Sequence, residues 1–219
     1  VAILTLAVGV GLSTALFSVI HAAVLRPLPY PDPEQLVRVD VLQPPGEGRV
    51  NRLAPSLEDV RTWRGDQRVF RHVAVDRGDD ELIVDTGEAE RVTVHRISEG
   101  FFDVLGVRPL HGRDFTADDT RRDTPLVVLL GHSYWRLRFG ADTAAIGRQI
   151  RVTGEPATIV GVLPPGVYST VSVWQPYPRQ QLPDTMRGSG APVIARLQPH
   201  LTRADAERNL SQMIAAFDV

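Results

Sequence analysis

The chain has 219 residues, of which 43% are hydrophobic and 23% are charged, and its formal net charge at pH 7 is −2. All 24 basic residues are arginine and there is no cysteine, which excludes a Walker A phosphate loop, a Schiff-base lysine, a disulfide framework and cysteine-based metal sites. The balanced charge also differs from that of nucleic-acid-binding domains, which carry a strongly basic face.

The first 25 residues are uncharged, 18 of them are hydrophobic, and the first charge of the chain is Arg26. A helix of this length is about 37 Å long, enough to cross a hydrocarbon core of about 30 Å with some tilt. A signal peptide would need a basic start and a shorter apolar run, and a buried core helix of this length would show a polar stripe. We therefore predict a transmembrane helix over residues 1–25.

Small residues recur on one face of this predicted helix at spacings of four, four, three and four. Such residues allow another helix to approach closely in a membrane, although they are also common in membrane helices generally. The candidate helix-packing residues are Ala7, Gly11, Ala15, Ser18 and Ala22.

A proline-rich connector occupies residues 26–35, with proline at every second position from 27 to 33. Proline removes backbone donors and fixes φ, so the helix must end and the chain must leave in an extended form. Residues 26–40 hold two arginines and three acids. This is not the basic cluster of a cytoplasmic flank, which favours an extracytoplasmic location for residue 26 onward.

The rest of the chain alternates between strand-like and helix-like segments and is predicted to be α+β. Strands are expected at 36–42, 69–75, 82–85, 91–97, 125–130, 149–153, 157–163, 171–174 and 192–197, with a loop over 43–54. Helices are expected to start after 55, at 99–105, 132–139 and 202–217, each with a hydroxyl residue as N-cap: Ser56, Ser98, Ser133 and Thr202. The last strand and helix have no returning strand, so we expect an unpaired sheet edge and a fragment truncated at both ends.

The one segment that suggests catalysis is 131–135, which comes after an apolar strand as a nucleophile elbow would. Ser133, Asp184 and His200 have the chain order of a hydrolase triad. The second glycine of that motif is replaced by Trp135, however, and Ser133 as a helix N-cap is the better interpretation. A membrane-anchored extracytoplasmic hydrolase or ligand-binding domain stays as the alternative function.

The sequence also gives no metal or cofactor site. Its six histidines lack paired spacing, and the acidic stretch 114–123 lacks the glycine and glutamate of a calcium loop. Interleaved arginines make that stretch a solvated loop. No catalytic, metal-binding or cofactor-binding residue is predicted, and no cofactor in this chain.

Four blocks in one order carry a family resemblance: 24–34; 101–110 with Gly112, Arg113 and Phe115; 134–140 continuing to 146–148; and 154–166. Together they resemble the MacB-like periplasmic core domain of MacB/FtsX-type ABC transporter permeases, and are similar to orphan permeases of soil bacteria. The residues of the domain-core motif are Phe101, Phe102, Leu105, Gly106, Trp135, Phe139, Gly140, Gly147 and Gly161.

The resemblance implies a transmembrane helix at 1–25 and a periplasmic core domain at 36–219, which ends before its last strand. Porter-like βαβ parts would lie at about 36–78 and 190–219, with a mostly β subdomain inserted at 79–189. It also implies a permease subunit of the bacterial inner membrane that transmits ATP-driven movement for export or extraction, and is not itself an enzyme. Its implied partners are an ABC ATPase, a second permease unit in a homodimer or pseudo-dimer, a periplasmic adaptor and membrane lipid, without nucleic acid.

Overall fold

The structure is a computed structural model that describes residues 30–43, 51–53, 55, 57–121, 123–177 and 192–217. The predicted transmembrane helix and its five packing residues lie outside these ranges, and so do Ser56 and Asp184. Among the described residues, no helix is long and apolar enough to cross a membrane.

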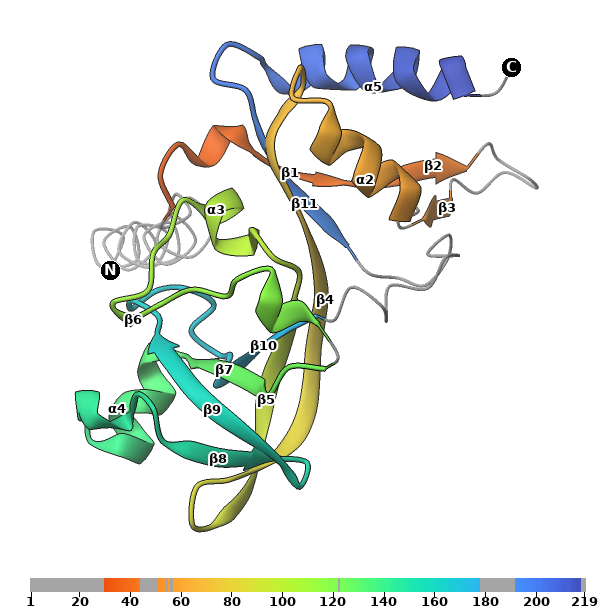
Figure 1. Cartoon of the computed structure of the whole chain (residues 1–219). Helices are drawn as coiled ribbons and strands as arrows, with labels where there is room; N and C mark the ends of the chain where they lie inside the picture. The colour runs from red at the N-terminus through yellow and green to blue at the C-terminus, as the bar shows by residue number, and fades with distance from the viewer. Residues whose placement is uncertain are drawn as a thin grey trace, which may run out of the picture.

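The described chain mixes short helices with strands (Figure 1). The strands are β1 (Leu36–Val39), β2 (Val41–Gln43), β3 (Asn51–Leu53), β4 (Phe70–Asp85), β5 (Ala89–Ile97), β6 (His111–Gly112), β7 (Leu126–Leu130), β8 (Gln149–Val152), β9 (Glu155–Val162), β10 (Val173–Pro176) and β11 (Val193–Leu197). The helices are α2 (Leu57–Gly65), α3 (Phe101–Leu105), α4 (His132–Phe139) and α5 (Arg203–Phe217), with 3-10 turns η1 (Pro33–Gln35), η2 (Asp118–Thr120) and η3 (Thr143–Ala145).

The βαβ part, as we name it, consists of β1, α2, the start of β4, β11 and α5, at the top of Figure 1. Strand β11 lies between β1 and β4 and is antiparallel to both. Strands β1 and β4 are therefore parallel, and α2 connects them in a split βαβ arrangement. Both helices cover the same sheet face, because Val60, Trp63 and Ala206 share one buried cluster with Val73 and Ala195.

The ring part consists of six strands that pair in a closed circle. Strand β4 pairs with β5, β5 with β10, β10 with β7, β7 with β9, β9 with β8, and β8 again with β4. Because the circle is closed, each of these strands pairs with a neighbour on both sides, and the circle has no free strand edge. Alternate side chains fill the interior, among them Val84, Val94, Leu130 and Ile159, all fully buried.

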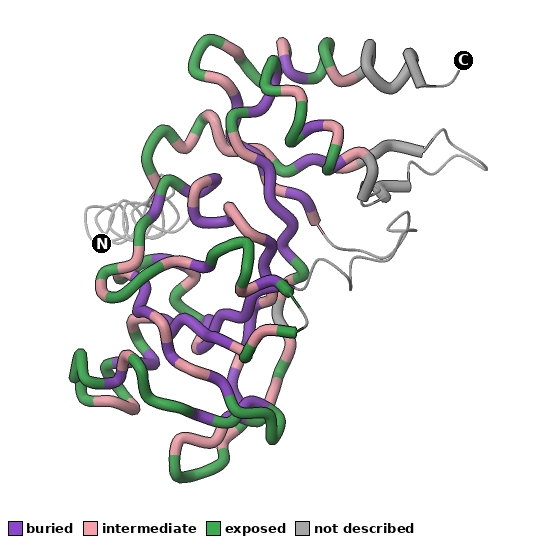
Figure 2. Tube along the Cα trace, in the orientation of Figure 1, coloured by how far each residue is buried: buried purple, intermediate pink, exposed green. Residues whose placement is uncertain are grey.

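A third buried cluster lies between the βαβ part and the ring part, where the purple segments of Figure 2 continue from one to the other. It contains Phe101 and Phe102 of α3 together with Trp174 of β10, and Leu36 and Ile194 of the βαβ part pack against it. The two parts therefore share an apolar interface.

Several predicted elements are confirmed. Helix α4 has the predicted bounds and ends at Gly140 in a left-handed conformation, the role that glycine fills without steric cost. Strand β7 is buried on both faces, and β8 and β9 form the predicted hairpin. Thr202 caps α5: the Asp205 N–H donates to its Oγ1 (3.3 Å), and the Thr202 N–H donates to the Asp205 carboxylate (2.9 Å).

Other expectations were wrong. The strands predicted at 69–75 and 82–85 are one 16-residue strand, β4, because the polar residues between them pair through their backbone with β5. The predicted strand 36–42 breaks at Asp40, and the loop 43–54 contains β3, which pairs with β2. Neither Ser98 nor Ser133 caps a helix, since glycines occupy the N-cap positions of α3 and α4.

Candidate functional site

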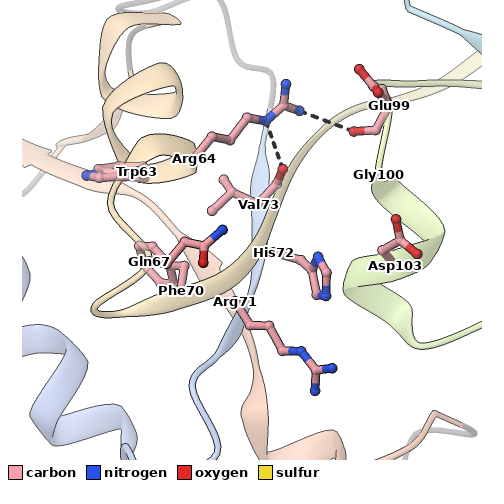
Figure 3. Close-up of a pocket in the computed structure, with 10 residues that line it drawn as sticks. All are labelled: Trp63, Arg64, Gln67, Phe70, Arg71, His72, Val73, Glu99, Gly100 and Asp103. Atoms are coloured by element: carbon pink, nitrogen blue, oxygen red, sulfur yellow. Dashed lines mark hydrogen bonds between the residues drawn. The ribbon is translucent and has the colours of Figure 1, made fainter. Parts of the chain in front are cut away.

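A polar hollow of about 350 Å³ opens where α2, β4 and α3 meet (Figure 3). Arg64 of α2 reaches across it: Nε donates to the Val73 carbonyl (3.0 Å), and Nη2 donates to Ser98 Oγ (2.8 Å) and to the Glu99 carbonyl (3.3 Å). Ser98 Oγ in turn accepts from the Val75 N–H at 2.9 Å. The serine predicted as a helix cap therefore joins α2 to the end of β5.

The other wall of the hollow carries His72 and Asp103, which Figure 3 shows on facing elements, β4 and α3. Burial lowers the pKa of His72, and the nearby cations Arg71, Arg196 and Arg108 lower it further, while Asp103 opposes them. Asp103 also pairs with Arg108 at 3.3 Å on the protein surface. The wall therefore holds mixed charges, which neutralise one another, and a histidine that favours its neutral form.

A second hollow of about 300 Å³ adjoins this wall and also has Arg71, His72 and Asp103 in its lining. Its remaining side is formed by Pro31 and Asp32 of the connector, by Gly106 after α3, and by Arg196 of β11. Arg196 is only 5% exposed. It donates from Nε to the Val104 carbonyl (2.7 Å) and from Nη1 to the carbonyls of Pro31 (3.0 Å) and Asp32 (3.4 Å).

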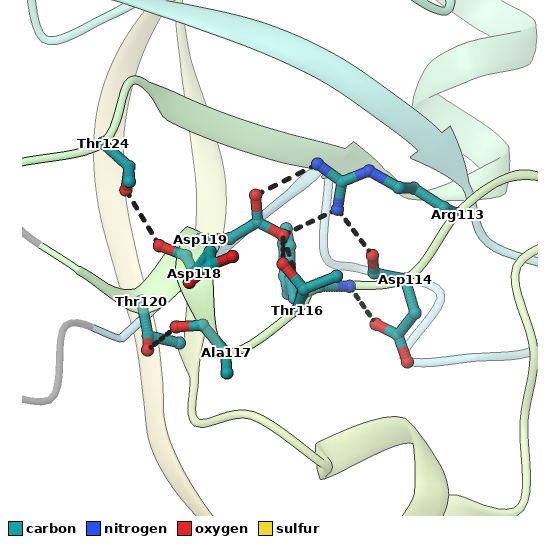
Figure 4. Close-up of polar contacts among 9 residues, drawn as sticks. Arg113, Asp114, Thr116, Ala117, Asp118, Asp119, Thr120 and Thr124 are labelled. Carbon is teal, nitrogen blue, oxygen red and sulfur yellow. Dashed lines mark hydrogen bonds and ion pairs between the residues drawn. The ribbon is translucent and has the colours of Figure 1, made fainter.

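The acidic stretch is an internally bonded loop (Figure 4). Arg113 donates from both terminal nitrogens to the Asp119 carboxylate, at 2.6 and 3.0 Å. Asp119 also accepts from the N–H and hydroxyl of Thr116, and Arg121 pairs with Asp123 at 2.7 Å. These carboxylates are occupied by arginine and threonine, and within the described ranges no three His, Cys, Asp or Glu residues could hold a metal ion.

One carboxyl of this loop has an unusual environment. Burial raises the pKa of Asp114 to about 6, although the Phe115 N–H donates to its Oδ1 at 2.6 Å and favours the charged form. Desolvation therefore outweighs the hydrogen bond.

The proposed triad residues lie in different places. Ser133 is exposed on α4 in the ring part, and His200 is exposed in the turn between β11 and α5 in the βαβ part. No hydrogen bond joins Ser133 to a histidine in the part of the chain that the structure describes. The described geometry therefore supplies no observation in favour of the hydrolase.

The domain-core motif divides between two clusters and the surface. Five of its residues are buried, namely Phe101, Phe102, Leu105, Trp135 and Gly161, and Phe139 is half-buried. The first three belong to the cluster between the parts, while Trp135 lies in the ring part. The remaining three glycines, Gly106, Gly140 and Gly147, are exposed, so they do not belong to the core; each has a positive φ, which favours glycine.

Three arrangements of the folded chain were not predicted from the sequence. The only sequence signal for Arg196 is that it is the one charged residue in the strand 193–197. His95 and Asp76 are both buried at the junction of the parts, and Nδ1 of His95 lies 3.4 Å from Oδ1 of Asp76. His111 and His132 both pack against Trp135, with ring centroids 5.4 and 5.8 Å away. The spacing of His132 and Trp135, three residues apart in α4, is that of neighbours on one helix face. The other contacts join separate elements, so no spacing in the sequence indicates them.

Comparison with known proteins gives a family match over nearly the whole chain. The family model described as MacB-like periplasmic core domain matches residues 1–213. The "Probable export ATP-binding/permease protein MacB" of Pseudomonas entomophila is 31% identical over 91 residues, which is 39% of this chain and 14% of that protein. The "Macrolide export ATP-binding/permease protein MacB" of Chromobacterium violaceum is 31% identical over 111 residues, 45% of this chain and 17% of that protein. The matches thus span less than a fifth of each relative.

Two solved structures share the fold. The periplasmic region of MacB from Actinobacillus actinomycetemcomitans aligns with a TM-score of 0.59 at 19% identity, over 75% of each chain. The extracellular domain of the noncanonic ABC-type transporter YknZ from Gram-positive bacteria aligns with a TM-score of 0.53 at 19% identity, over 74% of this chain and 85% of that one. At these identities the likeness establishes the fold.

Proposed function

The chain belongs to the MacB-like periplasmic core domain family, and we propose that it transmits an ATP-driven conformational change in a permease of the MacB/FtsX type. In this role it serves the export or extraction of a substrate, and the chemistry of ATP hydrolysis takes place in a partner. The names of the relatives, which describe export ATP-binding/permease proteins, support this assignment.

The proposal includes a location and partners. Residues 1–25 cross the bacterial inner membrane in contact with lipid, and everything after about residue 26 lies on the extracytoplasmic side. An ABC ATPase drives the movement, and a second permease unit completes a homodimer or pseudo-dimer. A periplasmic adaptor receives the extracytoplasmic domain. The long uncharged segment and the acidic flank after it support the location.

One observation carries the mechanical role. Strand β4 is 16 residues long and runs from the βαβ part, where it pairs with β11, into the ring part, where it pairs with β5 and β8. A shared strand of this kind passes a displacement from one part to the other along one backbone, which is paired on both sides of an irregular register at 76–79. Catalysis would instead require convergent reactive groups at a site.

The test uses the protein as its gene encodes it, together with the proposed ABC ATPase partner, in lipid nanodiscs. These 219 residues contain no cysteine, and any cysteine elsewhere in the encoded protein is replaced by serine. A fluorophore on Leu137→Cys, at a position that is 86% exposed on α4, then reports on the ring part alone. We expect the protein in the membrane fraction, copurification of the ATPase, and a fluorescence change on addition of ATP. An ATPase with a disabled Walker A lysine is the control and should abolish the change. A soluble full-length protein, or an assembled complex without any ATP response, would refute the proposal.

A further inference from the structure

Two segments that are far apart in the sequence, the connector and the motif 101–106, meet at Arg196 of β11. Its guanidinium bonds the carbonyl of Val104 near the end of α3 and the carbonyls of Pro31 and Asp32 in the connector. The bonding, the packing and the topology around this contact all indicate that it fixes how the molecule's parts are arranged.

The bonding is hard to replace. The last carbonyls of a helix have no partner within the helix, and Arg196 supplies one for α3. Its planar fork can serve carbonyls on two segments at once, which the single ammonium of lysine cannot do with the same geometry. Burial lowers the pKa of Arg196, while the nearby carboxylates of Asp32 and Glu34 oppose this shift. Removing the guanidinium would take this donor from all three carbonyl oxygens, and a buried carbonyl without a donor is costly.

The packing around Arg196 is equally close. Gly106 has φ +68°, and a Cβ placed on it would lie 3.2 Å from Arg196 Nη2 and 3.3 Å from Pro31 Cγ. The motif glycine, the connector proline and the β11 arginine thus touch at one point. A side chain at 106 would separate them, which explains why this position suits glycine.

The topology places this contact close to the point at which the strand shared by the two parts can bend. Arg196 lies on the middle strand of the βαβ part, in register with Leu36 of β1 and His72 of β4. Strand β4, which both parts share, has an irregular register between Asp76 and Asp79, with Gly78 at φ +81°. Irregular pairing at a glycine allows bending. Helix α3, which Arg196 bonds, packs against Trp174 of the ring part.

We infer that Arg196 is a positioning residue that holds the βαβ part and the ring part at a fixed angle and ties the connector to the same point. This inference deepens the proposed function, because it names the contact through which movement of the connector reaches both parts. Its test needs neither an ATPase nor a bilayer, so its failure would leave the proposed function intact, and the reverse also holds.

The test measures a distance between the parts by pulsed electron paramagnetic resonance, on the whole chain in neutral detergent micelles. Nitroxide labels are placed on Arg61→Cys in α2 and Arg136→Cys in α4, both exposed. A second pair, Arg61→Cys with Arg203→Cys in α5, both exposed, reports inside the βαβ part. We expect Arg196→Met to broaden the distance distribution of the first pair and to leave the second pair unchanged.

Arg138→Met is the matched control, because Arg138 bonds Thr86 and pairs with Glu88 and Glu90 entirely within the ring part. It should leave both distributions as in the parent chain. Arg196→Lys keeps the charge but lacks the fork, so it should also broaden the first distribution, and it covers the case in which the methionine variant does not fold.

Hydrogen exchange adds a local readout of the same contact. The amides of Gly106 and Val107, which bond back into α3, should exchange about tenfold faster in Arg196→Lys, since a net hydrogen bond lost is worth about that factor. A folded Arg196 variant with the parent's narrow distribution between positions 61 and 136 would overturn the inference.

Discussion

Truncation of Phe102 to alanine is the most direct test of the interface between the two parts. The side chain is 1% exposed. Its ring lies 5.4 Å from that of Phe101 and 5.3 Å from that of Trp174, both edge-on. Phe102→Ala removes a side chain of α3 that packs against its neighbour Phe101 and against Trp174 of the ring part.

The expected cost can be worked out from the burial. Replacing a fully buried phenylalanine by alanine costs about 3–5 kcal/mol, through the lost transfer energy and the cavity that remains. Each kcal/mol shifts the melting temperature of a chain of this size by about 2–4 °C. We therefore expect Tm to fall by about 10 °C, with a proportionate loss in the free energy of unfolding.

The assay is urea denaturation of the whole chain in neutral detergent, monitored by tryptophan fluorescence, because Trp174 is in direct contact with the altered position. Leu137→Ala is the matched control: it also shortens an apolar side chain, but Leu137 is 86% exposed and should change stability by less than about 0.5 kcal/mol. A loss below about 1 kcal/mol in Phe102→Ala would refute the burial on which the reasoning rests.

Three further outcomes are expected. Burial raises the pKa of Asp114 to about 6, so the folded state holds this proton more tightly than the unfolded chain, and the free energy of unfolding should fall as pH rises from about 4 through 6. Asp114→Asn should flatten this pH dependence in urea denaturation and stabilise the protein at neutral pH. An unchanged pH profile in the variant would contradict this prediction. Gly106→Ala should lower the stability measured by thermal denaturation by about 1 kcal/mol or more beyond the loss in Gly140→Ala. Both glycines have positive φ, but only a methyl group at position 106 would crowd Arg196. Equal losses in the two variants would argue against that crowding. Gly11→Ile should weaken helix association in a membrane two-hybrid assay, since a branched side chain blocks close approach, and unaltered association would place that face toward lipid.

Local signals in the sequence were sufficient where an element is defined by its own residues. The apolar run 126–130 specified a strand buried on both faces, and Gly140 ended α4 where expected. Thr202 and Asp205 formed their capping pair because both partners lie within one helical turn. The blocks spread from residue 24 to 166 were likewise enough to identify the family, which the match over 1–213 confirms.

Local signals failed where the outcome depended on a distant partner. Ser98 has the sequence environment of a helix cap. Its hydroxyl oxygen instead accepts hydrogen bonds from the Arg64 side chain and the Val75 N–H, both far from it in sequence. The polar residues 76–81 gave no strand pattern, yet β5 offered them backbone pairing and made β4 continuous. Backbone pairing depends little on side-chain polarity, so hydrophobic periodicity did not indicate it.

For the candidate site, too, some features follow from the sequence and others only from the tertiary structure. The sequence by itself determined the composition, the family and the separate motifs at 24–34 and 101–110. Only the tertiary structure brought those motifs to Arg196, because burying a guanidinium requires carbonyl partners that come from the connector and α3, more than ninety residues away along the chain. Ring closure through β8 and β4 was decided in the same manner, by hydrogen bonds that exist only once the chain has folded.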